Sequence, residues 1–185
     1  MVASFPLPDP ELRDERVRLR PPALRDAAAL TEACRDPDIR HWTFVPSPYG
    51  PEHAHGWIDG AAAAREAGEE LRLVIASADD DAVLGTTGLL RPRWEHRSAE
   101  IGYLVAPWAR GRGVATRSTR LLSRWALGAM GLARVTLEIA VDNAASRRVS
   151  ARAGFVEEGV LQSVIEEKGR HWTLAVSSLL PEDLA

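Results

Sequence analysis

Two hydrophobic periods alternate along the chain, and the changes between them outline its elements. In the first third, apolar residues recur every three to four positions, which predicts helices over 23–36 and about 51–68. Residues 37–50 lie between these helices, mix prolines with aromatic side chains, and are expected to be irregular. Charged and apolar residues alternate over 16–20, which predicts a short strand with one exposed face.

Strand patterns dominate from residue 71 onward. They predict strands at 71–77, 82–90, 98–105, 134–141, about 155–165 and 171–179. Helical patterns interrupt them at 113–130 and at 142–155, where Asn143 is expected as the N-terminal cap and Gly154 as the stop. Because a helix connects 98–105 to 134–141, these two strands should be parallel. The pattern therefore predicts a mixed α/β fold.

Length and composition indicate one globular unit. The chain has 185 residues, 45% of them hydrophobic and 26% charged, which is enough for one core and argues against disorder. We expect a single domain over 1–185, with 1–14 as a loose leader. A net charge of −3 argues against a protein that binds nucleic acid over its whole surface.

Several features point to the cytoplasm. The lone cysteine, Cys34, cannot form an intramolecular disulfide, which fits a reducing compartment. The first residues carry prolines and acids and lack the pattern of a signal peptide. No apolar run approaches the roughly 20 residues that span a bilayer, so we expect no membrane association. A homodimer is one assembly that we allow for, and the sequence does not fix the oligomeric state.

The stretch PWARGRGVATRS, residues 107–118, interleaves Gly111 and Gly113 with Arg110 and Arg112 where a strand passes into a helix. A helix N-terminus carries unpaired N–H groups and partial positive charge, and glycine lets the backbone approach an anion closely. The stretch lacks the Gly-Lys-Ser/Thr of a P-loop and the GxGxxG of a dinucleotide site. It predicts a turn that binds an anion, with a plain turn as the alternative.

The residues Arg110-Gly111-Arg112-Gly113-Val114-Ala115 resemble the R/Q-x-x-G-x-G/A loop of the GNAT superfamily of acyl-CoA-dependent N-acetyltransferases. Further along, Asn143, Ser146 and Val149, followed by Ala153-Gly154-Phe155, resemble the N-x-x-S-x-x-V…G-F stretch of its RimJ/RimL-like branch. The segments RVRLRPPALRDAAAL and AEIGYLV also resemble that branch. The similarity extends over about residues 16–180.

This resemblance implies a GNAT fold, in which a mostly antiparallel sheet contains a parallel strand–helix–strand unit that splays to hold CoA. It implies acetyl-CoA as the acyl donor, with the pyrophosphate on backbone N–H groups of the loop and the pantetheine arm between the splayed strands. The cofactor-binding residues that it implies are Leu104, Val105, Arg110, Gly111, Arg112, Gly113, Val114, Ala115, Asn143 and Ser146.

The acetyl acceptor would be a primary amine, either a protein N-terminal α-amine or a small molecule, and the sequence does not decide between them. Transfer needs a base for the amine and a proton donor for the departing thiolate. Glu100 is the first candidate for the base, Glu138 and Glu166 are rivals, and a structural salt bridge is the alternative for Glu100. Ser146 is the candidate proton donor by resemblance to the branch. Ser150 stands where many members of the superfamily have a tyrosine.

Other features carry weaker hypotheses. His53 and His55 are two apart, so no helical face presents both to one metal, and no metal site is expected. Trp42, Phe44 and Trp57 either line an acceptor cleft or form local core. The arginines at 117, 120 and 124 form either a solvated helix face or a site for an acidic group. The rival class for the whole chain is a GNAT fold that senses acyl-CoA without turnover.

Overall fold

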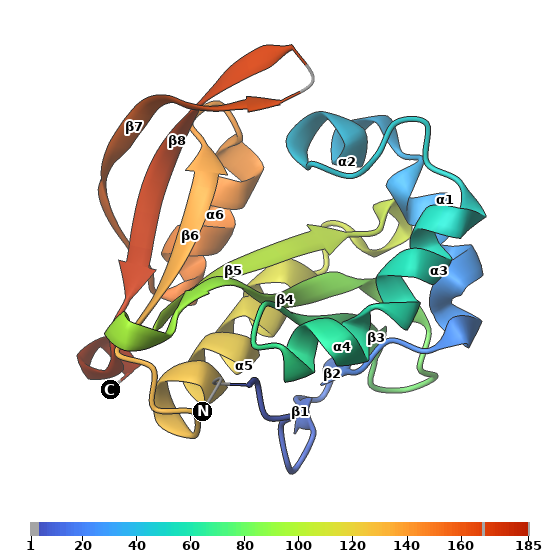
Figure 1. Cartoon of the computed structure of the whole chain (residues 1–185), viewed down its shortest axis with the longest axis horizontal. Helices are drawn as coiled ribbons and strands as arrows, with labels where there is room; N and C mark the ends of the chain where they lie inside the picture. The colour runs from blue at the N-terminus through green and yellow to red at the C-terminus, as the bar shows by residue number, and fades with distance from the viewer. Residues whose placement is uncertain (1–3, 168, 185) are drawn as a thin grey trace.

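The computed structural model describes residues 4–167 and 169–184. Its centre is an eight-stranded sheet in the order β1-β2-β3-β4-β5-β6-β8-β7 (Figure 1). Neighbouring strands are antiparallel except β5 and β6, so the predicted fold class is confirmed. The strands are β1 (Leu12–Arg13), β2 (Val17–Arg20), β3 (Leu71–Ser77), β4 (Val83–Arg93), β5 (Ser98–Val105), β6 (Arg134–Ala140), β7 (Val156–Glu167) and β8 (Arg170–Leu179).

The α-helices lie around the sheet. They are α1 (Ala27–Cys34), α2 (Pro37–Trp42), α3 (Pro51–Asp59), α4 (Ala61–Glu66), α5 (Val114–Gly128) and α6 (Ala144–Ala153). Helix α6 packs against the second half of the sheet, at β6 and β7. Side chains alternate along a strand, so one face of β3 packs Leu73 and Ile75 into the core that includes α5, while its other face packs Val74 against α1 and α3. Burial on both faces explains why β3 reads as a nearly continuous apolar run.

The segment 37–50 differs from the sequence prediction. Its first six residues form α2, so the expectation of irregular chain is wrong there. The Asp36 side chain accepts a hydrogen bond from the N–H of Ile39 at 3.0 Å, and Pro37 occupies the first turn, where proline is favoured. Six residues are too few to show a hydrophobic period, so the capping residues are the only sequence signal of this helix.

Smaller differences occur elsewhere near the N-terminus. The single helix expected over 51–68 is two helices that meet at Gly60. Phe5, in the segment expected as a loose leader, is fully buried, and its ring centroid lies 4.7 Å from that of Trp94. None of the helices among residues 4–167 and 169–184 is long and apolar enough to cross a membrane.

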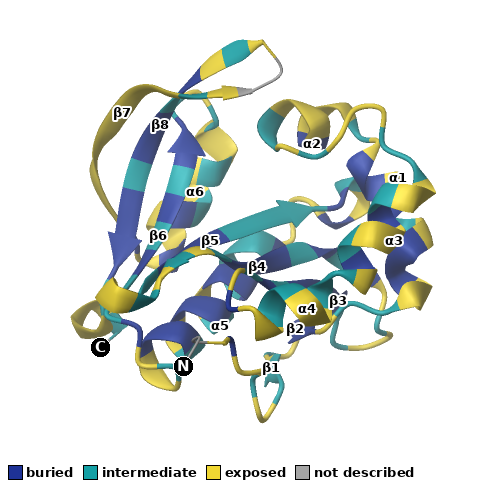
Figure 2. Cartoon of the chain, viewed as in Figure 1, coloured by how far each residue is buried: buried dark blue, intermediate teal, exposed yellow. Residues whose placement is uncertain are grey.

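The sheet opens in the middle. β5 and β6 are paired at Ser98–Arg134, Ala99–Val135 and Glu100–Thr136, and the described backbone shows no pairing between them beyond that point. In Figure 1, β5 then runs to the right while β6 rises away from it. The residues of β5 change from buried to half-buried after Ile101 (Figure 2). The predicted splay of the parallel strands is therefore present, and it creates the cleft described next.

Candidate active site

A cleft of about 680 Å³ lies where β5 and β6 separate. Its walls come from β4, β5 and β6, from α2, and from the first turns of α5 and α6. One end reaches the loop at Gly111 and Gly113, and the other reaches the carboxylates of Glu100 and Glu138. The cleft therefore connects the predicted cofactor loop with the predicted catalytic carboxylates.

The loop places the N-terminus of α5 at the cleft. Gly111 and Gly113 have φ angles of +74° and +76°, which side-chain-bearing residues rarely adopt, and Gly113 is the residue before the first turn. The neighbouring Val114 and Ala115 also line the cleft. A 15-residue helix begins here with unpaired N–H groups, which is the arrangement that binds phosphate.

The two arginines of the loop point to different surroundings. Arg110 donates to Asp36 at 2.5 Å and to Asp38 at 3.1 Å, so its guanidinium ties the loop to α2. Arg112 is exposed and does not line the cleft. Arg110 is thus paired with carboxylates while it also lines the cleft, and the contribution of both arginines to cofactor binding stays a prediction.

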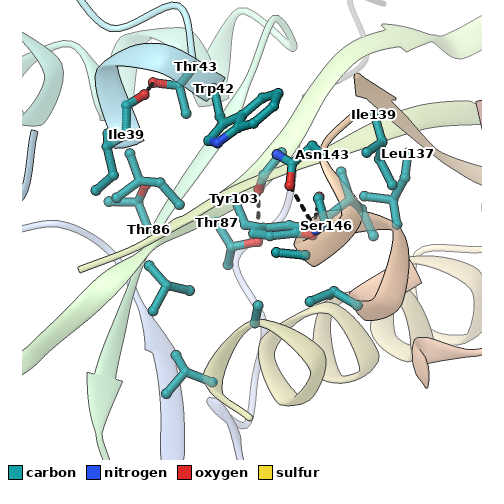
Figure 3. A pocket seen from close by; sticks show the side chains of 18 of the residues that line it. Ile39, Trp42, Thr43, Thr86, Thr87, Tyr103, Leu137, Ile139, Asn143 and Ser146 are labelled. Carbon is teal, nitrogen blue, oxygen red and sulfur yellow. Dashed lines mark hydrogen bonds between the residues drawn. The ribbon is translucent and has the colours of Figure 1, made fainter. Parts of the chain in front are cut away.

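A pair of hydroxyl groups lies on the α6 side of the cleft (Figure 3). The hydroxyl oxygens of Tyr103 and Ser146 are 2.6 Å apart, and either group could be the donor. Asn143 caps α6 by accepting the N–H of Ser146 at 3.0 Å, which fixes the serine at the start of the helix. Burial raises the pKa of Tyr103 to about 12, against a lowering by Ser146, so the phenol is protonated at neutral pH.

Tyr103 is the residue that the sequence analysis missed. The resemblance places a tyrosine near Gly154, whereas the tyrosine at this site comes from β5, 43 residues before Ser146. The alternation of side chains along β5 was the signal that could have found it. That alternation puts Tyr103 on the face opposite Glu100, and on that face Tyr103 meets Ser146. Ser150, the residue at the usual tyrosine position, is buried and does not line the cleft.

The carboxylates form a small cluster with one arginine. Arg91 of β4 contacts Glu100 at 2.6 Å and lies 3.7 Å from Glu138 of β6. Burial raises the pKa of Glu100 to about 7, Arg91 lowers it, and Glu138 raises it further by charge repulsion. The first candidate base, Glu100, and its rival Glu138 therefore share one site. The salt bridge that was the alternative role for Glu100 is also present, with Arg91 as the partner.

Aromatic side chains form the wall above these groups. Trp42, Phe44 and Trp57 all line the cleft. The rings of Trp42 and Phe44 lie 6.2 and 6.4 Å from the ring of Trp172, which is buried in β8. Trp57 packs instead against the cluster that contains Ala54 and Ile58 of α3. The two hypotheses are compatible, since each of these side chains packs locally and also borders the cleft.

Other candidates lie outside the cleft. Glu166 is exposed on β7, 3.9 Å from His171. His53 accepts from the N–H of Gly50 at 3.0 Å, His55 is exposed, and the described residues contain no group of three metal-ligating side chains. The arginines of α5 border a second hollow next to the loop, where Arg117 pairs with Asp14 and Glu15.

A sheet splayed at its parallel pair, with a glycine loop at the helix N-terminus between the two strands, defines the class of acyl-CoA N-acyltransferase folds. The Acetyltransferase (GNAT) domain family matches residues 16–156. The chain belongs to this GNAT acetyltransferase family, and RimJ is among its structural neighbours.

Three relatives illustrate the similarity. The Bacillus subtilis N-acetyltransferase YoaA is 28% identical over 92% of this chain and 97% of its own length. A phosphinothricin N-acetyltransferase of Streptomyces coelicolor is 32% identical over 86% of this chain and 93% of its own. The structure of Mycobacterium smegmatis RimJ in complex with CoA-disulfide superposes with a TM-score of 0.82 at 27% identity, covering 91% of this chain and 83% of that one.

Proposed function

We propose that this acetyltransferase transfers an acetyl group from acetyl-CoA to a primary amine by direct attack, with Glu100 as the base. The observation that carries the proposal is the joining of three features in one cleft. These are a helix N-terminus with its glycine loop, a buried carboxylate, and a half-buried pair of hydroxyl groups. Each feature matches one requirement of acyl transfer from a thioester to an amine.

The residues of the cleft fit the donor. Backbone N–H groups of 110–115 would hold the pyrophosphate at the N-terminus of α5. The edge of β5 around Leu104 and Val105, which no longer pairs with β6, would bond the pantetheine amides as a neighbouring strand does. Asn143 uses its side-chain oxygen for the cap, so its amide N–H₂ group would face the arm. Bound donor supplies an activated acetyl group.

The proton transfers of the reaction would balance. Glu100 takes the first proton from the ammonium group of the acceptor, for which a pKa near 7 is well matched at neutral pH. The free amine attacks the thioester carbonyl, and the carbon–sulfur bond breaks as the intermediate collapses. The pair of Tyr103 and Ser146 gives a proton to the departing thiolate, and the second proton that the nitrogen loses replaces it. We propose direct attack and not a covalent acyl-enzyme. The thiol of Cys34 is poorly suited as a nucleophile, because it is buried, its pKa is raised, and it does not line the cleft.

The acceptor is best described as a cationic amine. Glu100 and Glu138 together outweigh the charge of Arg91 at this end of the cleft, and the aromatic wall favours a cation. Both a peptide α-amine and a small amine satisfy this description. The relatives include a RimJ and a phosphinothricin N-acetyltransferase, so both kinds of acceptor belong in the test.

The test is a screen of peptides and small amines for release of CoA thiol, followed by Glu100→Gln with the best acceptor. The substitution should lower kcat/KM by about 10²–10⁴-fold near pH 7. The deficit should shrink as pH approaches the pKa of the acceptor amine, about 8 to 10, because solvent then removes the proton. Glu166→Gln, outside the cleft, is the matched control and should behave as the wild type. A deficit that is flat with pH would assign Glu100 a structural role, and release of thiol from no amine would favour a sensor.

A further inference from the structure

The backbone of β4 is irregular at Arg91. The pairing of β4 with β5 shifts register between Leu90 and Arg93, which marks a bulge. Within it, Arg91 has a φ of +45°, a region that residues with side chains rarely occupy. Pro92 follows directly and restricts the conformation of Arg91 further. Such strain persists when the surroundings enforce it, and it often accompanies function.

The bulge directs the guanidinium of Arg91 to the candidate base. Its Nε and Nη2 atoms lie 2.7 and 2.6 Å from the same atom, Oε2 of Glu100. The second oxygen, Oε1, has no hydrogen bond to any residue that the structure describes. The side chain of Glu100 is 10% exposed, whereas that of Arg91 is 54% exposed, so the arginine approaches from the open side of the cleft.

Few other charges act on this carboxylate. Glu138 of β6 is the other charged group of the cluster, and its Oε2 lies 3.7 Å from Arg91. Elsewhere in the cleft, Glu70 is paired with Arg72 at 2.8 Å, and Asp38 with Arg110. Arg91 is therefore the single basic side chain among the described residues that contacts Glu100.

We propose that Arg91 is a positioning residue for acetyl transfer, which binds one oxygen of Glu100, leaves the other for the acceptor amine, and keeps this carboxylate ionised beside Glu138. The proposal rests on the proposed function of Glu100 as the base. It explains why a strained arginine occupies a bulge of β4, because an ion pair with a buried carboxylate contributes little net stability once the cost of desolvation is included.

The test compares Arg91→Gln and Arg91→Lys with a control that has the same backbone. Arg97 is exposed and has a φ of +48°, so Arg97→Gln changes the same residue type at the same strained conformation without touching the cleft. Two quantities are measured for each variant. One is the pH dependence of kcat/KM, and the other is the titration of the Glu100 carboxyl followed by carbon NMR, assigned with Glu100→Gln.

Arg91→Gln should move both the acid limb of kcat/KM and the carboxyl titration toward higher pH by about one pH unit, because the opposite charge is gone. At pH 7, near the pKa of Glu100 in the wild type, this lowers the ionised fraction and hence kcat/KM about fivefold, and the loss approaches tenfold at lower pH. Arg91→Lys keeps the positive charge, so its titration should stay close to that of the wild type. Arg97→Gln should cause no shift. Glu138→Gln should move the titration the other way, since it removes a like charge.

An unshifted titration in folded Arg91→Gln would overturn the proposal, as would an equal shift in Arg97→Gln. The NMR titration does not depend on turnover. It therefore tests the action of Arg91 on Glu100 even if no amine is acetylated, an outcome that would instead remove the proposed function. A loss of about 100-fold or more in kcat/KM on Glu138→Gln would identify Glu138 as the base. It would also overturn the proposal that Arg91 positions Glu100 for catalysis.

Discussion

Glu100 shows how a functional side chain can oppose stability. A buried carboxylate loses its hydration, and the contact with half-exposed Arg91 replaces only part of it. The resulting pKa of about 7 lies above the ordinary value of 4.5, so between these values the folded chain binds more protons than the unfolded chain. The contribution of this group to stability is therefore retained at low pH and lost as pH rises toward 7.

Glu100→Gln is thus expected to stabilise the protein at pH 8 and to have little effect at pH 5. The pKa difference corresponds to at most ~3 kcal/mol, and screening of the exposed arginine reduces it to ~1–2 kcal/mol. For a domain of this size the melting temperature should rise by roughly 2–8 °C at pH 8. Thermal melts at both pH values, with Glu166→Gln as control, measure this. A variant that melts below the wild type at pH 8 would show that the pair with Arg91 outweighs the cost of burial.

The sequence indicated some site residues and concealed others for a physical reason. Glu100 and Ser146 were accessible because each lies in a short motif whose spacing is set by one strand or one helix. Tyr103 and Arg91 act through contacts between elements, and the direction of a side chain across a cleft is not encoded in local spacing. The φ of Arg91 in particular depends on a bulge that the pattern 82–90 did not reveal.

At the scale of elements, substitutions in the loop before α5 should affect acetyl-CoA binding and the free energy of unfolding to different extents. Gly113 and Gly131 have φ angles of +76° and +71°, and a Cβ on either would meet no neighbouring atom. Alanine at either position should therefore cost a similar ~1 kcal/mol in the free energy of unfolding. Only Gly113 precedes the helix N-terminus at the cleft, whereas Gly131 follows the far end of α5.

Gly113→Ala should weaken acetyl-CoA binding about 10–100-fold, the cost of disturbing one or more hydrogen bonds to a charged group. Gly131→Ala should bind as the wild type does. Calorimetric titration of both variants with acetyl-CoA gives the Kd, and their chemical unfolding gives the free energy of unfolding. Equal affinities for the two variants would mean that Gly113 serves the turn alone.

The contact between the loop and α2 leads to a prediction about the acceptor. Arg110 pairs with Asp36 and Asp38 at the start of α2, and this helix carries Trp42 into the cleft. Arg110→Ala should raise the KM of the acceptor about 2–5-fold, in keeping with half-exposed ion pairs, and should change the Kd of acetyl-CoA no more than Arg112→Ala does. Steady-state kinetics and calorimetry separate the two effects. A much larger loss of acetyl-CoA affinity in Arg110→Ala would show that this arginine turns to the pyrophosphate, as the family resemblance implied.

The fold itself was largely predictable at this scale, and the exceptions are short or mixed segments. The strand 98–105 and the capped helix after Asn143 follow from alternation and from side-chain capping, both of which act within a few residues. Helix α2 was not predicted, because contacts that are distant in sequence help to hold its six residues, among them the ion pair of Asp36 with Arg110 and the packing of Trp42 near Trp172. Its sequence carries a start signal and no period.

At the scale of the whole molecule, the donor should stabilise the folded chain because its cleft joins the two halves of the sheet. A ligand that binds only the folded state at 100 times its Kd adds about 2.7 kcal/mol, or roughly 5–10 °C in melting temperature for this size. Acetyl-CoA should produce this shift, whereas ATP and NAD, which lack the pantetheine arm that the β5 edge would bond, should produce little. Gly113→Ala should reduce the shift at the same concentration, while Gly131→Ala should keep it. A thermal melt without any shift at millimolar acetyl-CoA would contradict the assignment of the cleft to this donor, since the glycine loop and the splayed strands would then serve another ligand.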